Sequence, residues 1–149
     1  RQLGYFRDQQ CLSALGLRYG PDKNFYGHNY LDKYELLLRP LRDKVFTLLE
    51  LGVFNGGSEK MWQEYFPLAQ IVGVDIEERC RSYEDQRIRI EIMDLGEKEN
   101  LEVLKRYQPT VIIDDASHIW SHQILALFTL FHALPSGGIY ILKDIWRLR

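Results

Sequence analysis

Acidic side chains at the ends of apolar segments are the residues of this sequence best suited to chemistry. Each follows or closes a short run rich in Val, Ile and Leu: Glu50, Asp75, the pair Asp114 and Asp115, and Asp144. An unpaired carboxylate at a buried strand end is costly, and the adjacent pair needs a cation or donors to offset its repulsion. Asp115 and Asp144 could together form the oxygen-rich site that magnesium prefers.

His118 is the candidate for proton transfer. It follows Asp115 by three residues and precedes a predicted helix over 119–134. An imidazole with the ordinary pKa of about 6.5 accepts a proton near neutrality, so His118 is suited to act as a general base. The alternative is that it only caps the helix. His122 lies one turn later, and we interpret it as a packing residue.

The turn after the first apolar run indicates a small-molecule site. The motif E-x-G-x-x-x-G-G contains Gly52, Gly56 and Gly57 and is followed by Ser58, the predicted N-cap of a helix over 59–66. A dinucleotide fingerprint needs glycine at its middle position, where backbone approaches the pyrophosphate. Phenylalanine stands there in this chain, which disfavours close contact with a diphosphate. The alternative is an ordinary strand-to-helix turn.

Asp75 lies 25 residues after Glu50, at the end of the next predicted strand. In nucleotide-binding sheets an acid at this place accepts hydrogen bonds from ribose hydroxyls. The alternative is that Asp75 caps the following helix.

Strands and helices alternate along the chain. The predicted strands are 46–51, 70–76, 88–92, 110–113 and one within 137–145; the predicted helices are Tyr30–Leu38, 59–66, 97–107 and 119–134. This alternation predicts an α/β fold with a Rossmann-like, doubly wound, mainly parallel sheet and helices on both faces. The ends of the first and fourth strands should then flank the crevice at the topological switch point.

The length of 149 residues fits a single domain, with an N-terminal helical and loop segment over 1–40 and a Rossmann-like core over 45–149. The net charge of −2 gives no basic excess for nucleic acid, and no apolar run is long enough for a membrane span. Cys11 and Cys80 lack the C-x-x-C spacing. Together these features predict a cytoplasmic protein with no nucleic-acid or membrane partner.

The chain resembles a known enzyme family over about residues 12 to 146. In order and spacing, its segments are DK…HNY, LLELGVFNGGSEKMWQEYFP, IVGVDI, VIIDDASH and GGIYILKDIW. They resemble the macrocin and mycinamicin sugar O-methyltransferases, class I enzymes that depend on S-adenosylmethionine and are similar to cephalosporin-hydroxylase-like proteins. The resemblance implies an S-adenosylmethionine cofactor, a divalent metal that is usually magnesium, and a sugar hydroxyl of a natural product as acceptor.

The resemblance also implies roles for individual residues. It places Asp115 and His118 in catalysis, and Asp115 and Asp144 at the metal. The implied cofactor pocket consists of Glu50, Gly52, Gly56, Ser58, Asp75, Asp94 and Asp114, with Asp94 facing the adenine amino group.

Two features depart from the family pattern. Lys143 stands where the family has an acid before the final aspartate, so a cation replaces a metal ligand. The chain also stops after the predicted fifth strand, so we expect the last two strands of the usual seven-stranded sheet to be missing. An exposed sheet edge would favour a homo-oligomer.

The function predicted from the sequence is S-adenosylmethionine-dependent O-methylation of a hydroxyl on a sugar or natural-product glycoside. Two alternatives remain. One is a non-catalytic homologue that keeps the cofactor pocket, suggested by Lys143; the other is a nicotinamide-dependent oxidoreductase, suggested by the glycine turn and Asp75.

Overall fold

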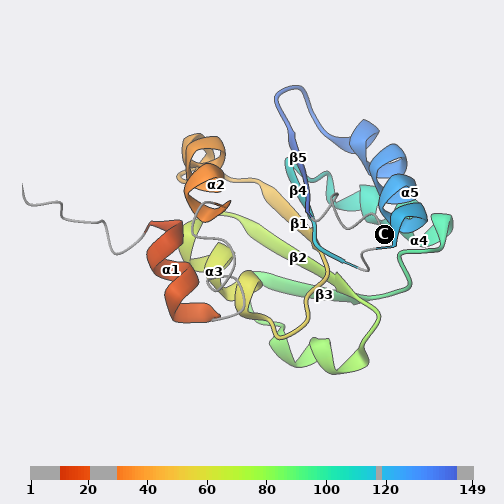
Figure 1. Ribbon diagram of the computed structural model, residues 1–149, viewed down its shortest axis with the longest axis horizontal. Coiled ribbons are helices and arrows are strands. Elements are labelled where there is room, and N and C mark those ends of the chain that lie inside the picture. The colour runs from red at the N-terminus through yellow and green to blue at the C-terminus, as the bar shows by residue number, and fades with distance from the viewer. Residues whose placement is uncertain (1–10, 21–29, 117–118, 144–149) are drawn as a thin grey trace, which may run out of the picture.

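A parallel sheet with helices on both faces forms the centre of the molecule. The structure is a computed structural model that describes residues 11–20, 30–116 and 119–143 (Figure 1). Within these residues the sheet has five strands in the order β3-β2-β1-β4-β5, all parallel to their neighbours. The strands are β1 (Thr47–Leu51), β2 (Gln70–Asp75), β3 (Ile88–Ile92), β4 (Val111–Asp114) and β5 (Ile139–Leu142). The predicted Rossmann-like α/β fold is confirmed.

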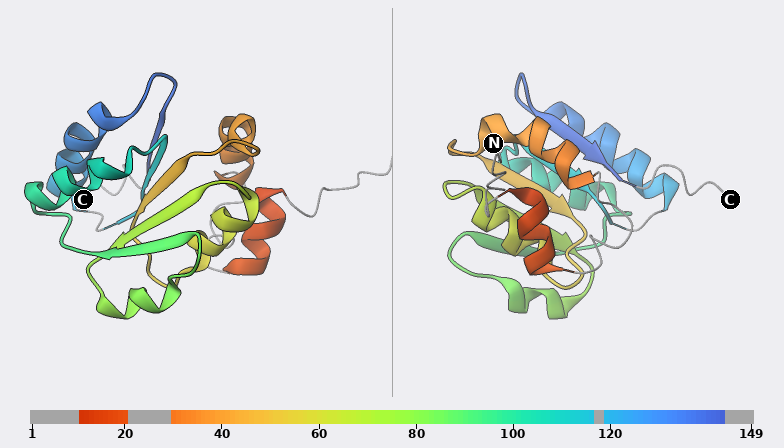
Figure 2. Two further views of the ribbon diagram at one scale, coloured as in Figure 1. Left: turned by 180° about the vertical axis from the view of Figure 1, so that it is seen from behind. Right: turned by 60° about the vertical axis from the view of Figure 1, so that its left-hand side comes forward.

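The helices divide into two groups, one on each side of the sheet (Figures 1 and 2). The first group is α1 (Leu12–Tyr19), α2 (Tyr30–Leu38) and α3 (Gly57–Tyr65), and the second is α4 (Lys98–Leu104) and α5 (Trp120–Leu130). Short 3-10 helices are η2 (Arg39–Leu41), η3 (Glu78–Tyr83), η4 (Lys105–Tyr107) and η5 (Phe131–Ala133). Among the described residues, no helix is both long and apolar enough to cross a membrane.

Side chains alternate between the two faces along each strand, and this alternation makes two separate cores. Leu48 on β1 packs with Trp62 and the other residues beneath α1, α2 and α3. Leu49, its neighbour, packs with Leu101 and Leu130 beneath α4 and α5. Central strands of a parallel sheet are covered on both faces, which is why they read as nearly continuous apolar runs.

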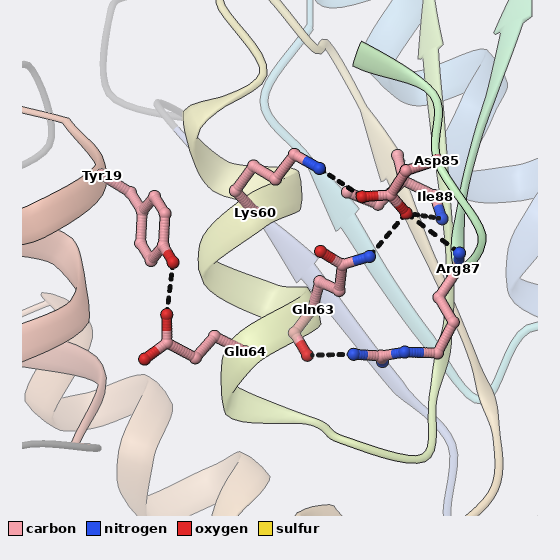
Figure 3. A network of polar contacts seen from close by, with 7 residues as sticks. All are labelled: Tyr19, Lys60, Gln63, Glu64, Asp85, Arg87 and Ile88. Carbon is pink, nitrogen blue, oxygen red and sulfur yellow. Dashed lines mark hydrogen bonds and ion pairs between the residues drawn. The ribbon is translucent and has the colours of Figure 1, made fainter.

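The end of α3 is held by a guanidinium from the segment before β3. One nitrogen of Arg87 donates to the carbonyls of Phe66 (2.9 Å) and Ala69 (3.0 Å), and the other donates to the carbonyl of Gln63 (2.8 Å). The last carbonyls of a helix have no partner within the helix, so this fork supplies the missing donors. Figure 3 shows the contact with Gln63.

Asp85 ties the first turns of α3 to the same segment (Figure 3). Its carboxylate pairs with Lys60 and accepts from the Gln63 side chain at 2.6 Å. The opposite side of α3 contacts α1, where the Tyr19 hydroxyl donates to Glu64. These contacts fix the helix that follows the glycine turn.

The predicted elements are found, with differences at their ends. The predicted helix Tyr30–Leu38 is found with these bounds within the described residues. The prediction that Ser58 caps α3 was wrong: the helix begins at Gly57, and Gly56 is the N-cap in a left-handed conformation (φ 72°) with no side-chain cap. Ser58 is instead buried in the first turn.

Candidate functional site

A cavity of about 1020 Å³ opens at the carboxyl ends of β1, β2 and β4. Glu50, Asp75 and Asp115 all line it, so the structure brings together the three acids on which the site prediction depends. β1 lies between β2 and β4. The chain leaves β2 toward one face of the sheet and β4 toward the other, and in a doubly wound sheet this divergence opens a crevice at the strand ends. The volume is at the upper end for small-molecule sites, which reach about 1,000 Å³.

The glycine turn forms the floor of the cavity between β1 and β2. The Gly52 N–H donates to the Val74 carbonyl at 2.8 Å, and the Gly52 backbone has φ 97°. A Cβ at this position would lie 2.5 Å from the carbonyl oxygen of Asp115. Glycine is therefore needed both for the conformation and for the close approach of β1 to the segment after β4.

Asp75 is held by backbone donors on the wall of the cavity. One carboxylate oxygen accepts from the N–H groups of Val53 (2.9 Å) and Phe54 (3.1 Å), and the other accepts from Glu77 (3.0 Å). Burial alone would raise the pKa of Asp75, but the donors from Glu77, Phe54 and Val53 outweigh it, so the pKa lies below its ordinary value. The carboxylate is consequently ionised and fixed in orientation near neutral pH.

Glu50 is fully buried at the carboxyl end of β1, on the α3 side of the sheet. The indole N–H of Trp62 on α3 donates to its carboxylate at 3.0 Å. The indole N–H is thus a hydrogen-bond partner of the kind that an acid on a buried strand needs. The side chain of Glu50 also lines the cavity, so a bound ligand could share it.

Asp115 and Lys143 form an ion pair in the same cavity. The Lys143 Nζ lies 2.5 Å from the Asp115 Oδ2, and the two side chains are 21% (Lys143) and 19% (Asp115) exposed. Both residues line the cavity. The residue that departs from the family pattern is therefore a direct partner of the predicted metal ligand.

Asp114 does not line the cavity. It is the last residue of β4 and is buried on the opposite face of the sheet, where the Tyr140 hydroxyl donates to its carboxylate at 3.2 Å. The reason is the twofold alternation of side chains along a strand, which sends neighbouring residues to opposite faces. Its predicted place in the cofactor pocket is not supported by this geometry.

Of the other residues predicted for the cofactor pocket, some line the cavity and one does not. Gly52, Ser58 and Asp94 line the cavity. Gly56 does not; a Cβ there would lie 2.5 Å from the ring of Tyr83, so Gly56 shapes the turn from behind. Asp94 follows β3, and its carboxylate accepts from the Gly96 N–H at 2.8 Å.

Two predicted site residues, His118 and Asp144, lie outside the described residues. Over the described ranges 11–20, 30–116 and 119–143, no group of three or more His, Cys, Asp or Glu side chains could hold a metal ion. The carboxylate of Asp115 is already paired with an ammonium. Within the described ranges, one carboxylate paired with an ammonium is not a donor set that fits a divalent metal.

Several lining residues were not identified as site residues from the sequence. The helices α1 and α2 bring Tyr19, Tyr30 and Tyr34 to the cavity, and α5 brings His122. The clustering of aromatic residues over 25–34 could have indicated Tyr30 and Tyr34. His122 was interpreted as a packing residue, and it does pack closely, since a Cβ on Gly96 would lie 2.8 Å from its Nε2.

Comparison with known proteins gives a consistent set of relatives, although no protein-family model matches the chain. The chain is 36% identical to an 8-demethyl-8-α-L-rhamnosyl tetracenomycin-C 2′-O-methyltransferase from Streptomyces olivaceus, over 93% of this chain and 39% of that protein. It is 34% identical to the mycinamicin VI 2″-O-methyltransferase from Micromonospora griseorubida, over 91% of this chain and 36% of that protein.

Solved structures point the same way. The MycE methyltransferase from the mycinamycin biosynthetic pathway, in complex with Mg and SAH, superposes with a TM-score of 0.86 at 33% identity, over 91% of this chain and 37% of that chain. A candidate caffeoyl-CoA O-methyltransferase from Staphylococcus aureus shares the fold, with a TM-score of 0.61 at 18% identity, over 79% of this chain and 62% of that chain.

The chain spans less than two fifths of the length of these sugar O-methyltransferases. Within that span the order of strands, the glycine turn and the acids at the strand ends all follow the predicted pattern. The predicted resemblance is confirmed: this chain is a homologue of the sugar O-methyltransferases of natural-product glycosides and has their Rossmann-like methyltransferase fold.

Proposed function

We propose that this chain binds S-adenosylmethionine in the cavity and that its protein transfers a methyl group to a hydroxyl of a sugar-like acceptor. The observation that carries the proposal is the convergence of Glu50 and Asp75 on one cavity, around a turn that requires glycine. The relatives named as sugar O-methyltransferases support it, as does the similarity to a methyltransferase crystallised with SAH.

The charge of the lining suits this cofactor. Among the described residues, five acids line the cavity (Glu50, Asp75, Glu77, Asp94 and Asp115), against two cations, Arg79 and Lys143. S-adenosylmethionine carries a sulfonium and an ammonium group, which such a lining attracts. A diphosphate would be repelled by the same acids.

Three of these acids can each be assigned a part of the cofactor. Asp75, ionised and fixed by backbone donors, would accept hydrogen bonds from the ribose hydroxyls. Glu50 would accept from the ammonium of the methionine part, beside the glycine turn. Asp94 would accept from the adenine amino group, and Ser58 would contribute the hydroxyl at the start of α3.

The acceptor would lie at the Asp115 side of the cavity. The bound cofactor supplies an electrophilic methyl group. Transfer needs an acceptor oxygen aligned with that methyl group and relieved of its proton. Asp115 would orient the hydroxyl, and His118 remains the predicted base. A cytoplasmic location, a homo-oligomer, and the absence of nucleic-acid and membrane partners remain predictions from the sequence.

The nicotinamide-dependent alternative is disfavoured by Phe54. This residue occupies the position that must be glycine for a pyrophosphate to approach the backbone. Phe54 lines the cavity, and its backbone adopts a left-handed conformation with φ 56°. Its ring therefore stands at the turn where a dinucleotide would place its phosphates.

Calorimetric titration with S-adenosylhomocysteine and with NAD tests the proposal. We expect binding of S-adenosylhomocysteine and no measurable binding of NAD. Asp75→Asn should weaken the binding of S-adenosylhomocysteine about 10-fold to 100-fold, because a charged acceptor of hydrogen bonds is lost. Binding of NAD without any response to S-adenosylhomocysteine would overturn the proposal.

Asp85→Asn is the matched control for that titration. Asp85, like Asp75, is an aspartate whose pKa is lowered by surrounding donors, but it does not line the cavity. We expect its affinity for S-adenosylhomocysteine to equal that of the wild type. Equal losses in the two variants would show that Asp75 acts through the fold and not through contact with the cofactor.

The non-catalytic alternative has the same cofactor pocket as the enzyme, so cofactor binding cannot distinguish the two. The formation of methylated product can. Incubation with labelled S-adenosylmethionine and rhamnosylated acceptors should give a methylated product if the protein is an enzyme. Cofactor binding without product on any glycoside acceptor would favour the non-catalytic homologue.

A further inference from the structure

The ion pair between Lys143 and Asp115 is held by the sheet itself. The Asp115 N–H donates to the Leu51 carbonyl at 2.9 Å, and the Lys143 N–H donates to the Asp114 carbonyl at 3.0 Å, so both continue the strand ladders. The Lys143 carbonyl also accepts from the Gln123 side chain on α5 at 3.1 Å. Both backbones are fixed, and the two side chains meet inside the cavity.

This pair engages the carboxylate that the resemblance assigns to a divalent cation. The ammonium lies 2.5 Å from the carboxylate oxygen, and each side chain is only about a fifth exposed. A metal ion bound to the same carboxylate would face the ammonium in a partly desolvated site, where like charges repel strongly. Oxygen ligands are what magnesium requires, and an ammonium offers none.

We propose that the ammonium of Lys143 takes the place of a divalent metal ion at the acceptor side of the cavity, so that this site works without magnesium. The inference rests on the proposed function. Lys143 would act as a positioning residue: it holds the Asp115 carboxylate in one orientation and supplies the positive charge there. MycE, in contrast, was crystallised with Mg.

The binding of Mn²⁺ in place of Mg²⁺, followed by electron paramagnetic resonance, tests the inference without any need for turnover. The wild-type chain should leave all Mn²⁺ free at millimolar concentration. Lys143→Glu should bind Mn²⁺ at least about tenfold more tightly, because two carboxylates then face each other in the cavity. Adding Asp115→Asn to Lys143→Glu should abolish that gain.

Lys44→Glu is the control for the change in net charge. Lys44 is exposed and precedes β1, at the opposite end of the strand from the cavity. We expect it to leave Mn²⁺ free, as in the wild type. A gain of Mn²⁺ binding equal to that of Lys143→Glu would overturn the inference, because the effect would then be one of overall charge.

Titration of the wild type with S-adenosylhomocysteine separates this inference from the proposed function. Equal affinity in EDTA and in millimolar magnesium is the expected result. Two results would overturn the inference and leave the proposed function standing. One is tight Mn²⁺ binding by the wild type that is lost in Asp115→Asn; the other is binding of S-adenosylhomocysteine that requires magnesium. These wild-type measurements decide the matter even if Lys143→Glu does not fold.

Discussion

Asp114 and Asp115 are neighbours in the chain with separate roles in the structure. Asp114 is buried on the side of α4 and α5 and accepts from the Tyr140 hydroxyl. Asp115 follows the strand, lines the cavity and pairs with Lys143. Because a strand sends successive side chains to opposite faces, a pair of acids at its end supplies one structural group and one group for the site.

Removal of the Asp114 carboxylate should therefore lower stability and leave the cofactor site intact. Burial and the charge of Asp114 raise the pKa of Tyr140, so the phenol keeps its proton and donates. Asp114→Ala leaves a partly buried hydroxyl without this acceptor, at a cost of about 1–3 kcal/mol. We expect a fall in Tm of roughly 3–10 °C by circular dichroism and unchanged affinity for S-adenosylhomocysteine.

Tyr140→Phe provides the second arm of a double-mutant cycle with Asp114→Ala. If the hydrogen bond is the reason for the loss, the double variant should be more stable than the sum of the two single losses predicts, by about 1 kcal/mol. Strict additivity in urea denaturation would show that the cost comes from other contacts of Asp114.

The sequence was sufficient to place Glu50, Asp75 and Asp115 at one cavity, because each ends an apolar run of strand length. It was not sufficient to place Lys143 against Asp115. That contact depends on the pairing of β4 with β5, in which Asp114 lies opposite Leu142. Register between distant strands is set by packing and not by local pattern.

At the scale of elements, the turn between β1 and α3 decides how the cavity is built. Gly52 turns the chain with φ 97°, and Phe54 and Gly56 also have positive φ. Such a turn lets backbone amides reach the Asp75 carboxylate. The two glycines adopt positive φ without strain, so the strain of this turn falls on Phe54, the one residue of the three that has a Cβ.

Gly52→Ala should disrupt the turn. The added Cβ would need a left-handed conformation and would meet the Asp115 carbonyl oxygen at 2.5 Å. The atoms that it would meet are backbone, so relief requires movement of β1 or β4, and we expect a loss of at least about 2 kcal/mol in the free energy of unfolding. Urea denaturation measures the loss, and binding of S-adenosylhomocysteine should weaken with it.

Gly20→Ala is the control for that substitution. Gly20 follows α1 with φ −177°, and a Cβ added there would have no atom of the described residues within 4 Å. We expect a change in the free energy of unfolding within about 0.5 kcal/mol. A loss as large as that of Gly52→Ala would mean that the cost reflects glycine replacement in general and not the geometry of the turn.

The elements that the sequence located best are those set by apolar pattern. Strand β3 was predicted at Ile88–Ile92 and is found there. It lies at the edge of the sheet, and its alternation of apolar and charged residues is typical of a half-exposed strand. The start of α3 was missed because its cap is a left-handed glycine and not a side chain. Cys80 lies in the highly charged segment 77–87, yet it is buried beneath the glycine turn, where its thiol donates to the Phe54 carbonyl at 3.7 Å.

At the scale of the whole molecule, the cavity is a joint product of the sheet and the N-terminal helices. The sheet edge supplies the acids, and α1 and α2 supply aromatic walls from a part of the chain that precedes β1. Leu12, Leu15 and Leu31 pack into the same core as Leu48 of β1. The alternation of strands and helices predicted that the sheet edge supplies the acids. No local pattern shows where helices that precede the sheet will pack.

Acid should unfold this molecule through carboxylates that the fold keeps ionised. In the part of the chain that the structure describes, four such groups have pKa values below the ordinary 3.8 of Asp and 4.5 of Glu: Glu64, Asp75, Asp85 and Glu91. In Glu64 the main cause is the Tyr19 hydroxyl. In the other three, burial opposes ionisation, but nearby donors outweigh it.

The sign of the pH dependence follows from these lowered pKa values. The unfolded chain binds protons first as the pH falls, so the stabilisation from the four carboxylates is fully present above about pH 5 and is lost progressively below about pH 4.5. Urea denaturation at pH 7, 5, 4 and 3 should show a nearly constant free energy of unfolding down to pH 5 and a steep decrease below it. Asp85→Asn, which removes one of the four groups, should be less stable at pH 7 and should show a shallower decrease. A decrease of equal steepness in the variant would mean that the network around Asp85 does not stabilise the fold through its charge.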